Sequence, residues 1–136
     1  MEYMLDTNIC IYIIKKRPLV VLEKLQTRKI TDIAISSITL SELKYGVEKS
    51  MNRERNRLAL AEFIVPFEIF DFGVMATNEY GKIRADLEKQ GSPIGCLDTL
   101  IAAHALSEKL TLITNNEKEF CRVKNLKVEN WTRNPI

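Results

Sequence analysis

The chain has 136 residues, 46% of them apolar and 28% charged, a composition that predicts one folded domain over residues 1–136 and excludes intrinsic disorder. Twenty Lys and Arg against eighteen Asp and Glu leave a net charge of +2, so a surface that binds a polyanion must come from local clustering. The three cysteines lack the number and spacing of a disulfide framework or a zinc site, and no apolar run reaches the roughly 18 residues of a membrane span, so we expect a cytoplasmic protein without membrane contact.

Strands alternate with helices along the whole chain. In chain order, we predict a strand at 4–5, helices at 9–14 and 18–25, a strand at 32–36, helices at 40–47 and 52–64, a strand at 67–70, helices at 74–89 and 97–108, a strand at 111–114, a turn at 115–120 and a strand at 126–129. Thr7 or Asn8 is expected to cap the first helix, and Ser37 or Thr39 the helix that carries Glu42.

This alternation, without hairpin signals, predicts an α/β fold with a central parallel sheet and helices on both faces. Such sheets bind their ligands just beyond the carboxyl ends of the strands. The chain shows no internal repeat, linker or low-complexity segment.

Acidic residues stand where the predicted strands give way to helices. Asp6 ends the first strand, Glu42 lies on the helix after the second strand, and Asp98 opens a helix after a Gly- and Pro-rich loop. Glu117 and Glu119 follow the strand at 111–114. A lone aspartate at such a place is more often a helix cap, and a lone glutamate a solvated helix residue. Their common position at one edge of the sheet favours a shared site instead.

Converging carboxylates repel one another unless a cation neutralises them. A hard divalent ion such as Mg²⁺ takes oxygen ligands and keeps several waters, which leaves room for a phosphate oxygen and a hydrolytic water. The pattern therefore predicts metal-dependent hydrolysis of a phosphodiester.

Five segments carry a resemblance to a known family. They are Tyr-Met-Leu-Asp-Thr-Asn at 3–8, Ser-Ser-Ile-Thr-Leu-Ser-Glu-Leu-Lys-Tyr-Gly at 36–46, the segment from Gly-Ser-Pro-Ile-Gly to Asp98 at 91–98, Ile-Ala-Ala-His-Ala at 101–105, and Thr-Asn-Asn-Glu-Lys-Glu-Phe at 114–120. Together they closely resemble the PIN-domain VapC toxins over nearly the entire chain. The resemblance implies that Asp6, Glu42 and Asp98 are the family's metal-binding acids.

The fourth acid is open, because many family members have an aspartate in the turn where this chain has Asn-Asn followed by two glutamates. Glu119 is the favoured candidate and Glu117 the alternative. The polar residues expected to orient water or the metal ligands are Thr7, Asn8, Thr114 and Asn116.

The resemblance also implies a function and its partners. It predicts a bacterial Mg²⁺- or Mn²⁺-dependent endoribonuclease, the toxin of a VapBC toxin–antitoxin pair. Such a toxin is a homodimer, is inhibited by a small VapB-like antitoxin, and reaches operator DNA only through that antitoxin. The RNA substrate that the resemblance suggests is tRNA, with initiator tRNA as the leading candidate.

Basic and aromatic residues on the middle helices suggest further surfaces. The densest basic stretch comprises Lys44, Lys49, Arg53, Arg55 and Arg57. These residues are candidates for RNA phosphate contacts, although charged helix faces are usually only solvated. Tyr45 and the apolar residues near Leu58 could equally line a groove for an antitoxin helix. His104, the single histidine, invites a general-base role, but its place deep in an Ala-rich helix favours a structural one.

Two other functions compete with the nuclease. An Asp-nucleophile phosphatase also begins with an aspartate after a buried strand, but it needs a second aspartate two residues on, where this chain has Asn8. A non-catalytic interaction module with the same fold should have lost at least one of Asp6, Glu42 and Asp98, and all three are present.

Overall fold

The computed structural model describes residues 1–133 and contains one five-stranded sheet. The strands are β1 (Tyr3–Leu5), β2 (Ile33–Ser36), β3 (Glu68–Phe70), β4 (Thr111–Ile113) and β5 (Val128–Glu129). They run parallel throughout, in the order β3-β2-β1-β4-β5. The helices are α1 (Thr7–Lys15), α2 (Leu19–Gln26), the short 3₁₀ turn η1 (Ile30–Asp32), α3 (Ser37–Glu48), α4 (Arg53–Ile64), α5 (Val74–Lys89), α6 (Cys96–Ser107) and α7 (Glu117–Phe120).

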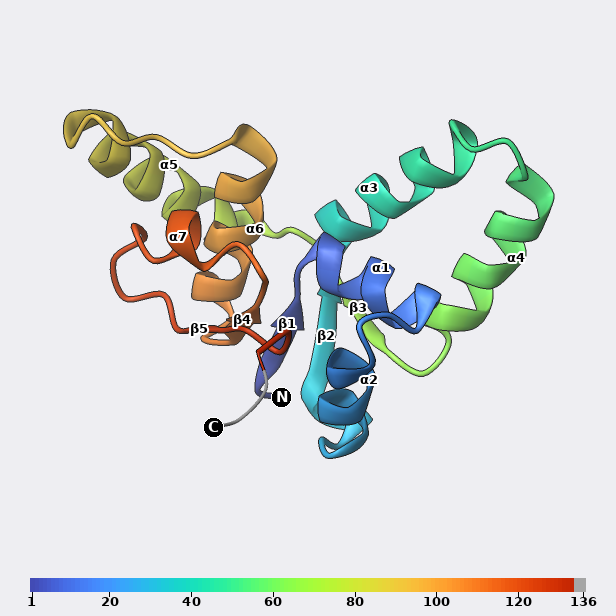
Figure 1. The fold of residues 1–136 in the computed structure, drawn as a ribbon. Coiled ribbons are helices and arrows are strands. Elements are labelled where there is room, and N and C mark those ends of the chain that lie inside the picture. The colour runs from blue at the N-terminus through green and yellow to red at the C-terminus, as the bar shows by residue number, and fades with distance from the viewer. Residues whose placement is uncertain (134–136) are drawn as a thin grey trace.

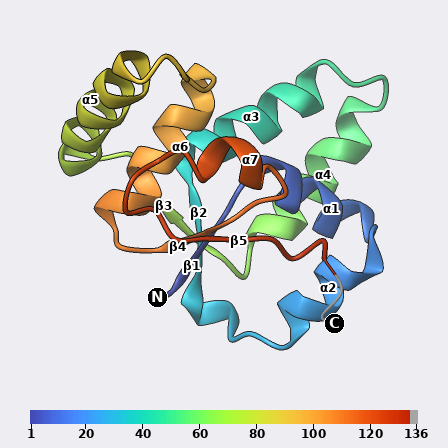
Figure 2. The same cartoon turned by 60° about the vertical axis from the view of Figure 1, so that its left-hand side comes forward.

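Helices cover both faces of the sheet, as predicted (Figure 1). Successive residues of a strand point to opposite faces, so each strand contributes to two cores. In β1, Leu5 belongs to the core under α1 to α4, whereas Met4 belongs to the core under α5 and α6. In β4, Ile113 and Leu112 divide in the same way. A view turned by 60° shows α5 and α6 on one side and α1, α2 and α4 on the other (Figure 2).

The caps of two helices differ from the prediction. Asp6, and neither Thr7 nor Asn8, is the N-cap of α1, because its Oδ1 accepts the Thr7 backbone N–H at 2.7 Å. Ser36, and neither Ser37 nor Thr39, is the N-cap of α3, with its Oγ accepting the Ile38 N–H at 3.0 Å. In both cases the polar residue at the end of the strand is also the N-cap, so the helix begins directly after the strand without an intervening loop.

The C-terminal segment returns to the sheet. Trp131 is fully buried, its ring meets the Tyr3 ring edge-on at 5.8 Å, and its Nε1 donates to Glu129 at 2.8 Å. Arg28 lies over both rings and pairs with Glu129. These contacts fix β5 beside β4. Within residues 1–133, no helix is both long and apolar enough to cross a membrane.

Candidate metal centre at the carboxyl edge of the sheet

The candidate site lies where the strand order of the sheet reverses, that is, where strands stop adding on one side of β1 and begin to add on the other. After β1, the next two strands in the chain, β2 and β3, lie on one side of β1, whereas β4 and β5 lie on its other side. Open parallel sheets usually bind their ligands at such a reversal, beyond the carboxyl ends of the strands, which here are β1 and β4. Asp6 follows β1 and Thr114 follows β4, so the two residues face each other there.

Hydrogen bonds from two segments, the start of α1 and the end of β4, hold Asp6 in place. Its Oδ1 accepts the Thr7 N–H at 2.7 Å and its Oδ2 accepts the Thr114 hydroxyl at 2.7 Å. Only 4% of the residue is exposed. Burial raises the pKa of the Asp6 carboxyl, the two hydrogen bonds oppose the rise, and repulsion from Glu42 adds to it. Asp6 is therefore a fixed carboxylate in an environment that disfavours its charge.

Thr7 joins Asp6 to the next acid. Its backbone N–H binds Asp6, and its hydroxyl donates to Glu42 Oε1 at 2.7 Å. Glu42 is half-buried on α3, whose N-cap is Ser36. The first turn of α1 thus sets the position of a side chain that is 35 residues away in the sequence.

Asp98 faces the same group from α6. It lies in the first turn of that helix, where the helix dipole favours a negative charge. The opposing effects are larger: burial first, then repulsion from Asp6, Glu119 and Glu42, together with a hydrogen bond to Glu119, raise the pKa of Asp98 to about 6. All four candidate acids therefore lie close enough to influence one another.

The two glutamates of α7 point to different partners. Glu119 Oε2 accepts the Asn116 side-chain amide at 3.0 Å, and the same carboxylate interacts with Asp98. Glu117 pairs instead with Arg133 at 3.2 Å. The structure brings Glu119, and not Glu117, to the other three acids.

Three of the four polar residues proposed from the sequence touch these acids. Thr7 and Thr114 donate to them directly, and Asn116 binds Glu119 while its N–H donates to Thr114 Oγ1 at 3.0 Å. Asn8 does not; its amide reaches Asn115 Oδ1 at 3.4 Å.

Asn115, in the turn after β4, also has a structural role at this edge of the sheet that was not predicted from the sequence. Besides accepting from Asn8, it donates to the Tyr12 hydroxyl at 3.0 Å and so ties the turn after β4 to α1. The Asn-Asn pair directly after a strand could have indicated this role, because short amide side chains at such turns often make local hydrogen bonds.

The charge of the four acids is not neutralised by the protein. None of the ion pairs within residues 1–133 involves Asp6, Glu42, Asp98 or Glu119. In the same part of the chain, no three His, Cys, Asp or Glu side chains are already gathered tightly enough to hold a metal ion. Hydrogen bonds from Thr7 and Asn116 hold two of the glutamates, Glu42 and Glu119. The donor set is all oxygen and strongly anionic, which fits a hard divalent cation.

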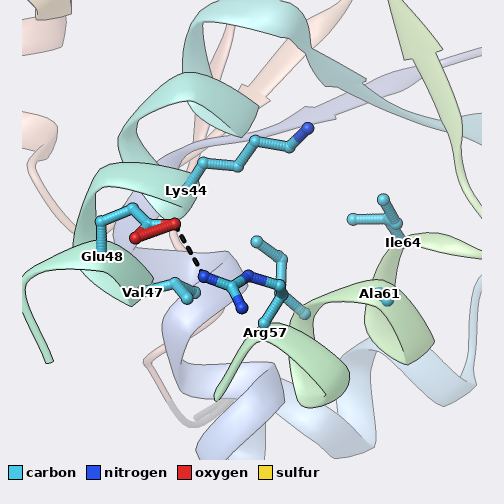
Figure 3. Close-up of a pocket in the computed structure, with 7 residues that line it drawn as sticks. Lys44, Val47, Glu48, Arg57, Ala61 and Ile64 are labelled. Carbon is cyan, nitrogen blue, oxygen red and sulfur yellow. Dashed lines mark hydrogen bonds and ion pairs between the residues drawn. The ribbon is translucent and has the colours of Figure 1, made fainter. Parts of the chain in front are cut away.

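A second feature is a groove between α3 and α4. It has a volume of about 360 Å³ and is lined by Lys44, Val47, Glu48, Arg57, Leu60, Ala61 and Ile64. Arg57 reaches across it to Glu48 at 2.9 Å (Figure 3). Arg57 also pairs with Glu54, and Lys49 lies over the Tyr45 ring at 5.0 Å. Of the five predicted RNA-binding residues, Arg57 is therefore already engaged in ion pairs.

His104 does not reach the acids in this structure. It is fully buried on α6 and contacts Ser36 and Phe72 instead. This buried position agrees with the predicted structural role of His104 and not with a role as general base.

Comparison with known proteins identifies relatives over the full length. The family model "PIN domain" matches residues 3–126. "Ribonuclease VapC2" of Rickettsia felis is 50% identical over 134 residues, covering 98% of this chain and 100% of the relative. The "tRNA(fMet)-specific endonuclease VapC" of Shigella flexneri is 43% identical over 132 residues, covering 97% of this chain and 99% of the relative. A crystal structure of VapBC2 from Rickettsia felis, bound to a DNA fragment from its promoter, contains a chain that matches with a TM-score of 0.90 and 49% identity, covering 96% of this chain and 99% of that one.

Proposed function

The chain belongs to the PIN-domain family as a VapC ribonuclease toxin of a VapBC toxin–antitoxin system, and from this premise we propose how and where it acts. We propose a Mg²⁺- or Mn²⁺-dependent endoribonuclease, a single domain over residues 1–136, with its active site at Asp6, Glu42, Asp98 and Glu119. The observation that carries the proposal is the group of four acids that no basic side chain of residues 1–133 neutralises.

The acids would hold the divalent cation, which when bound supplies Lewis acidity toward a phosphate oxygen and activates water. The protein's own residues prepare that site. Thr114 and Thr7 fix the two oxygens of Asp6, and Thr7 also orients Glu42. The proton that Asp98 carries below a pH of about 6, in contact with Glu119, must leave before both carboxylates can act as ligands.

We further propose tRNA, and initiator tRNA in particular, as the substrate. The support is the name of the Shigella flexneri relative, a tRNA(fMet)-specific endonuclease that matches this chain from end to end. The exposed basic residues Lys44, Lys49, Arg53 and Arg55 are the proposed phosphate contacts. Unlike Arg57, they form no ion pair within the described residues. Such a substrate places the toxin in the bacterial cytoplasm.

The direct test is cleavage of defined RNA by the purified toxin. Initiator tRNA should be cut in Mg²⁺ or Mn²⁺ and left intact in excess chelator. Asp6→Asn should abolish cleavage while the protein stays folded, because it removes a ligand charge from the cation. Asp86→Asn, on α5 and outside the cluster, is the matched control and should cleave normally. Cleavage that persists in chelator would refute the metal mechanism. A wild type that cuts other RNA but no tRNA would refute the proposed substrate, and a wild type that cuts no RNA would favour the non-catalytic interaction module.

We propose that a VapB-like antitoxin inhibits the toxin by placing an Arg or Lys among the four acids. A basic side chain there would satisfy the same negative charge as the cation, so the two should compete. Mn²⁺ binding, followed by the electron paramagnetic resonance of the free ion, should weaken sharply in the toxin–antitoxin complex. A complex that binds Mn²⁺ as tightly as the free toxin would contradict this arrangement.

The assembly proposed for the cell is a toxin homodimer bound to antitoxins, which in turn contact operator DNA. The support is the crystal structure of the Rickettsia felis VapBC2 proteins on their promoter fragment. The groove between α3 and α4, with its apolar floor of Val47, Leu60 and Ile64, is a place where the apolar face of an antitoxin helix can pack.

A further inference from the structure

His104 connects the two helices that carry Glu42 and Asp98. It lies on α6, six residues after Asp98, and none of its surface is exposed. Its Nδ1 is 2.7 Å from Ser36 Oγ, a buried contact between residues 68 positions apart. Ser36 ends β2 and caps α3, the helix of Glu42. This contact is therefore a polar link between the start of α3 and the body of α6.

The hydrogen-bonding capacity of Ser36 indicates how the link is made. Ser36 Oγ already accepts the Ile38 N–H at 3.0 Å, so its own hydroxyl hydrogen needs an acceptor. The only other hydrogen-bond partner of Ser36 Oγ within residues 1–133 is His104 Nδ1. We assign the hydroxyl as donor and Nδ1 as acceptor, which requires the neutral imidazole with its proton on Nε2. In this arrangement Ser36 satisfies the Ile38 N–H in the first turn of α3 and is itself held by α6.

The surroundings of the ring support the neutral form. The Phe72 ring meets the imidazole edge-on at 5.4 Å, and the neighbouring α6 residues Ala103 and Ala105 are fully buried. Burial lowers the pKa of the His104 imidazole, although Glu108 and Asp71 oppose the shift. The Asp71 backbone also faces the ring, but Nε2 forms no well-aligned hydrogen bond within residues 1–133, so Nδ1 and packing hold the ring in place.

We propose that His104 is a positioning residue for the ribonuclease site: by accepting the Ser36 hydroxyl, it fixes the start of α3 against α6 and so sets Glu42 relative to Asp98. The inference rests on the proposed function of these two acids. His104 acts through Ser36 and α3, because within residues 1–133 its side chain meets Ser36, the Phe72 ring and the Asp71 backbone rather than the acids. It is not a catalytic residue.

The test compares two substitutions at position 104. His104→Leu keeps an apolar volume but removes the acceptor. His104→Asn keeps an acceptor oxygen near the place of Nδ1. We expect His104→Leu to lower the cleavage rate at saturating RNA by roughly ten- to hundred-fold, the size expected when an active-site group shifts by about an ångström. The KM for RNA should stay unchanged, and His104→Asn should recover most of the rate.

Direct Mn²⁺ binding, measured without RNA by electron paramagnetic resonance, provides a readout that does not depend on cleavage. His104→Leu should weaken Mn²⁺ binding, and His104→Asn should restore it. Ile101→Val, fully buried on the same helix but without a polar contact, is the control for a loosened core. It should lower the melting temperature and leave both the rate and Mn²⁺ binding unchanged.

A double substitution tests whether the two residues act together. Ser36→Ala removes the same hydrogen bond from the other side, so the double variant with His104→Leu should be no slower than the slower single variant. A His104→Leu protein that cuts RNA and binds Mn²⁺ like the wild type would overturn the inference, as would losses no larger than those of Ile101→Val. These outcomes differ from failure of the proposed function, in which the wild type itself would not cleave.

Discussion

Asp98 should make the cation-free protein less stable than it would be with a neutral residue at that position. Its pKa is raised from 3.8 to about 6 by burial and by the neighbouring acids, so in the folded state the ionised form is disfavoured. Asp98→Asn removes that charge at nearly constant size. We therefore expect the variant to be inactive and yet more stable than the wild type in excess chelator near neutral pH.

The magnitude follows from the shift. A rise of about two pKa units corresponds to roughly 3 kcal/mol. Asp98 is only half-buried, so solvent screening reduces this to about 1.5 kcal/mol. Loss of a favourable charge in the first turn of α6 subtracts about 0.5 kcal/mol. A net gain of about 1 kcal/mol raises the melting temperature of a domain of this size by about 2–6 °C.

The pH dependence distinguishes charge from packing. A carboxyl with a raised folded pKa contributes stability below its unfolded pKa of 3.8, and this contribution is lost as pH rises through about 6. The advantage of Asp98→Asn should therefore be largest at about pH 8 and shrink toward about pH 4. Differential scanning calorimetry in chelator at both ends of this range, with Asp86→Asn as control, measures it. An advantage that is absent at about pH 8, or equal at both ends, would refute the reasoning.

Two further predictions concern the residues around the cluster. Glu119→Gln should impair cleavage across a Mn²⁺ titration, whereas Glu117→Gln should lose only its partly exposed pair with Arg133. A larger defect in the Glu117 variant would mean that the fourth acid is wrongly assigned. Thr114→Val removes the hydroxyl that donates to Asp6 and so should raise the Asp6 pKa further, weakening Mn²⁺ affinity by roughly ten- to hundred-fold and shifting the pH profile of cleavage upward; an unshifted profile would contradict this role.

The placement of Asp6 and Asp98 could be predicted because each follows a local pattern. A short buried strand ending in an acid, and a Gly-rich loop leading into a helix, both place a side chain at the carboxyl edge of a parallel sheet. The helix layers on both faces of the parallel sheet could also be predicted, because the alternation of strands and helices is likewise a pattern that the sequence shows locally. The predicted helix caps were wrong by one or more residues. Asp6 and Ser36 each stand where a strand ends and a helix begins, and periodicity alone does not fix such a boundary to one residue.

The contacts that join distant segments could not be predicted. The bond between Thr7 and Glu42 depends on β1 and β2 being neighbours, and the bond between Thr114 and Asp6 depends on β1 and β4 being neighbours. The strand order that creates both contacts is not encoded in any local pattern. The preference for Glu119 over Glu117 agrees with the structure, but the ion pair that Glu117 makes with Arg133 joins distant segments and could not be predicted.

The same residues that begin the helices also organise the acids, and this has a consequence for interpreting substitutions. Asp6 caps α1 and belongs to the carboxylate cluster, while Ser36 caps α3 and binds His104. Replacing either one changes a helix terminus as well as the site, so a loss of activity alone does not identify the cause. Charge and hydrogen bonding can be separated from a general loss of folding only by a measurement that responds specifically to the charges of the site. Mn²⁺ affinity and the pH dependence of stability are such measurements, because both respond to the repulsion among Asp6, Glu42 and Asp98.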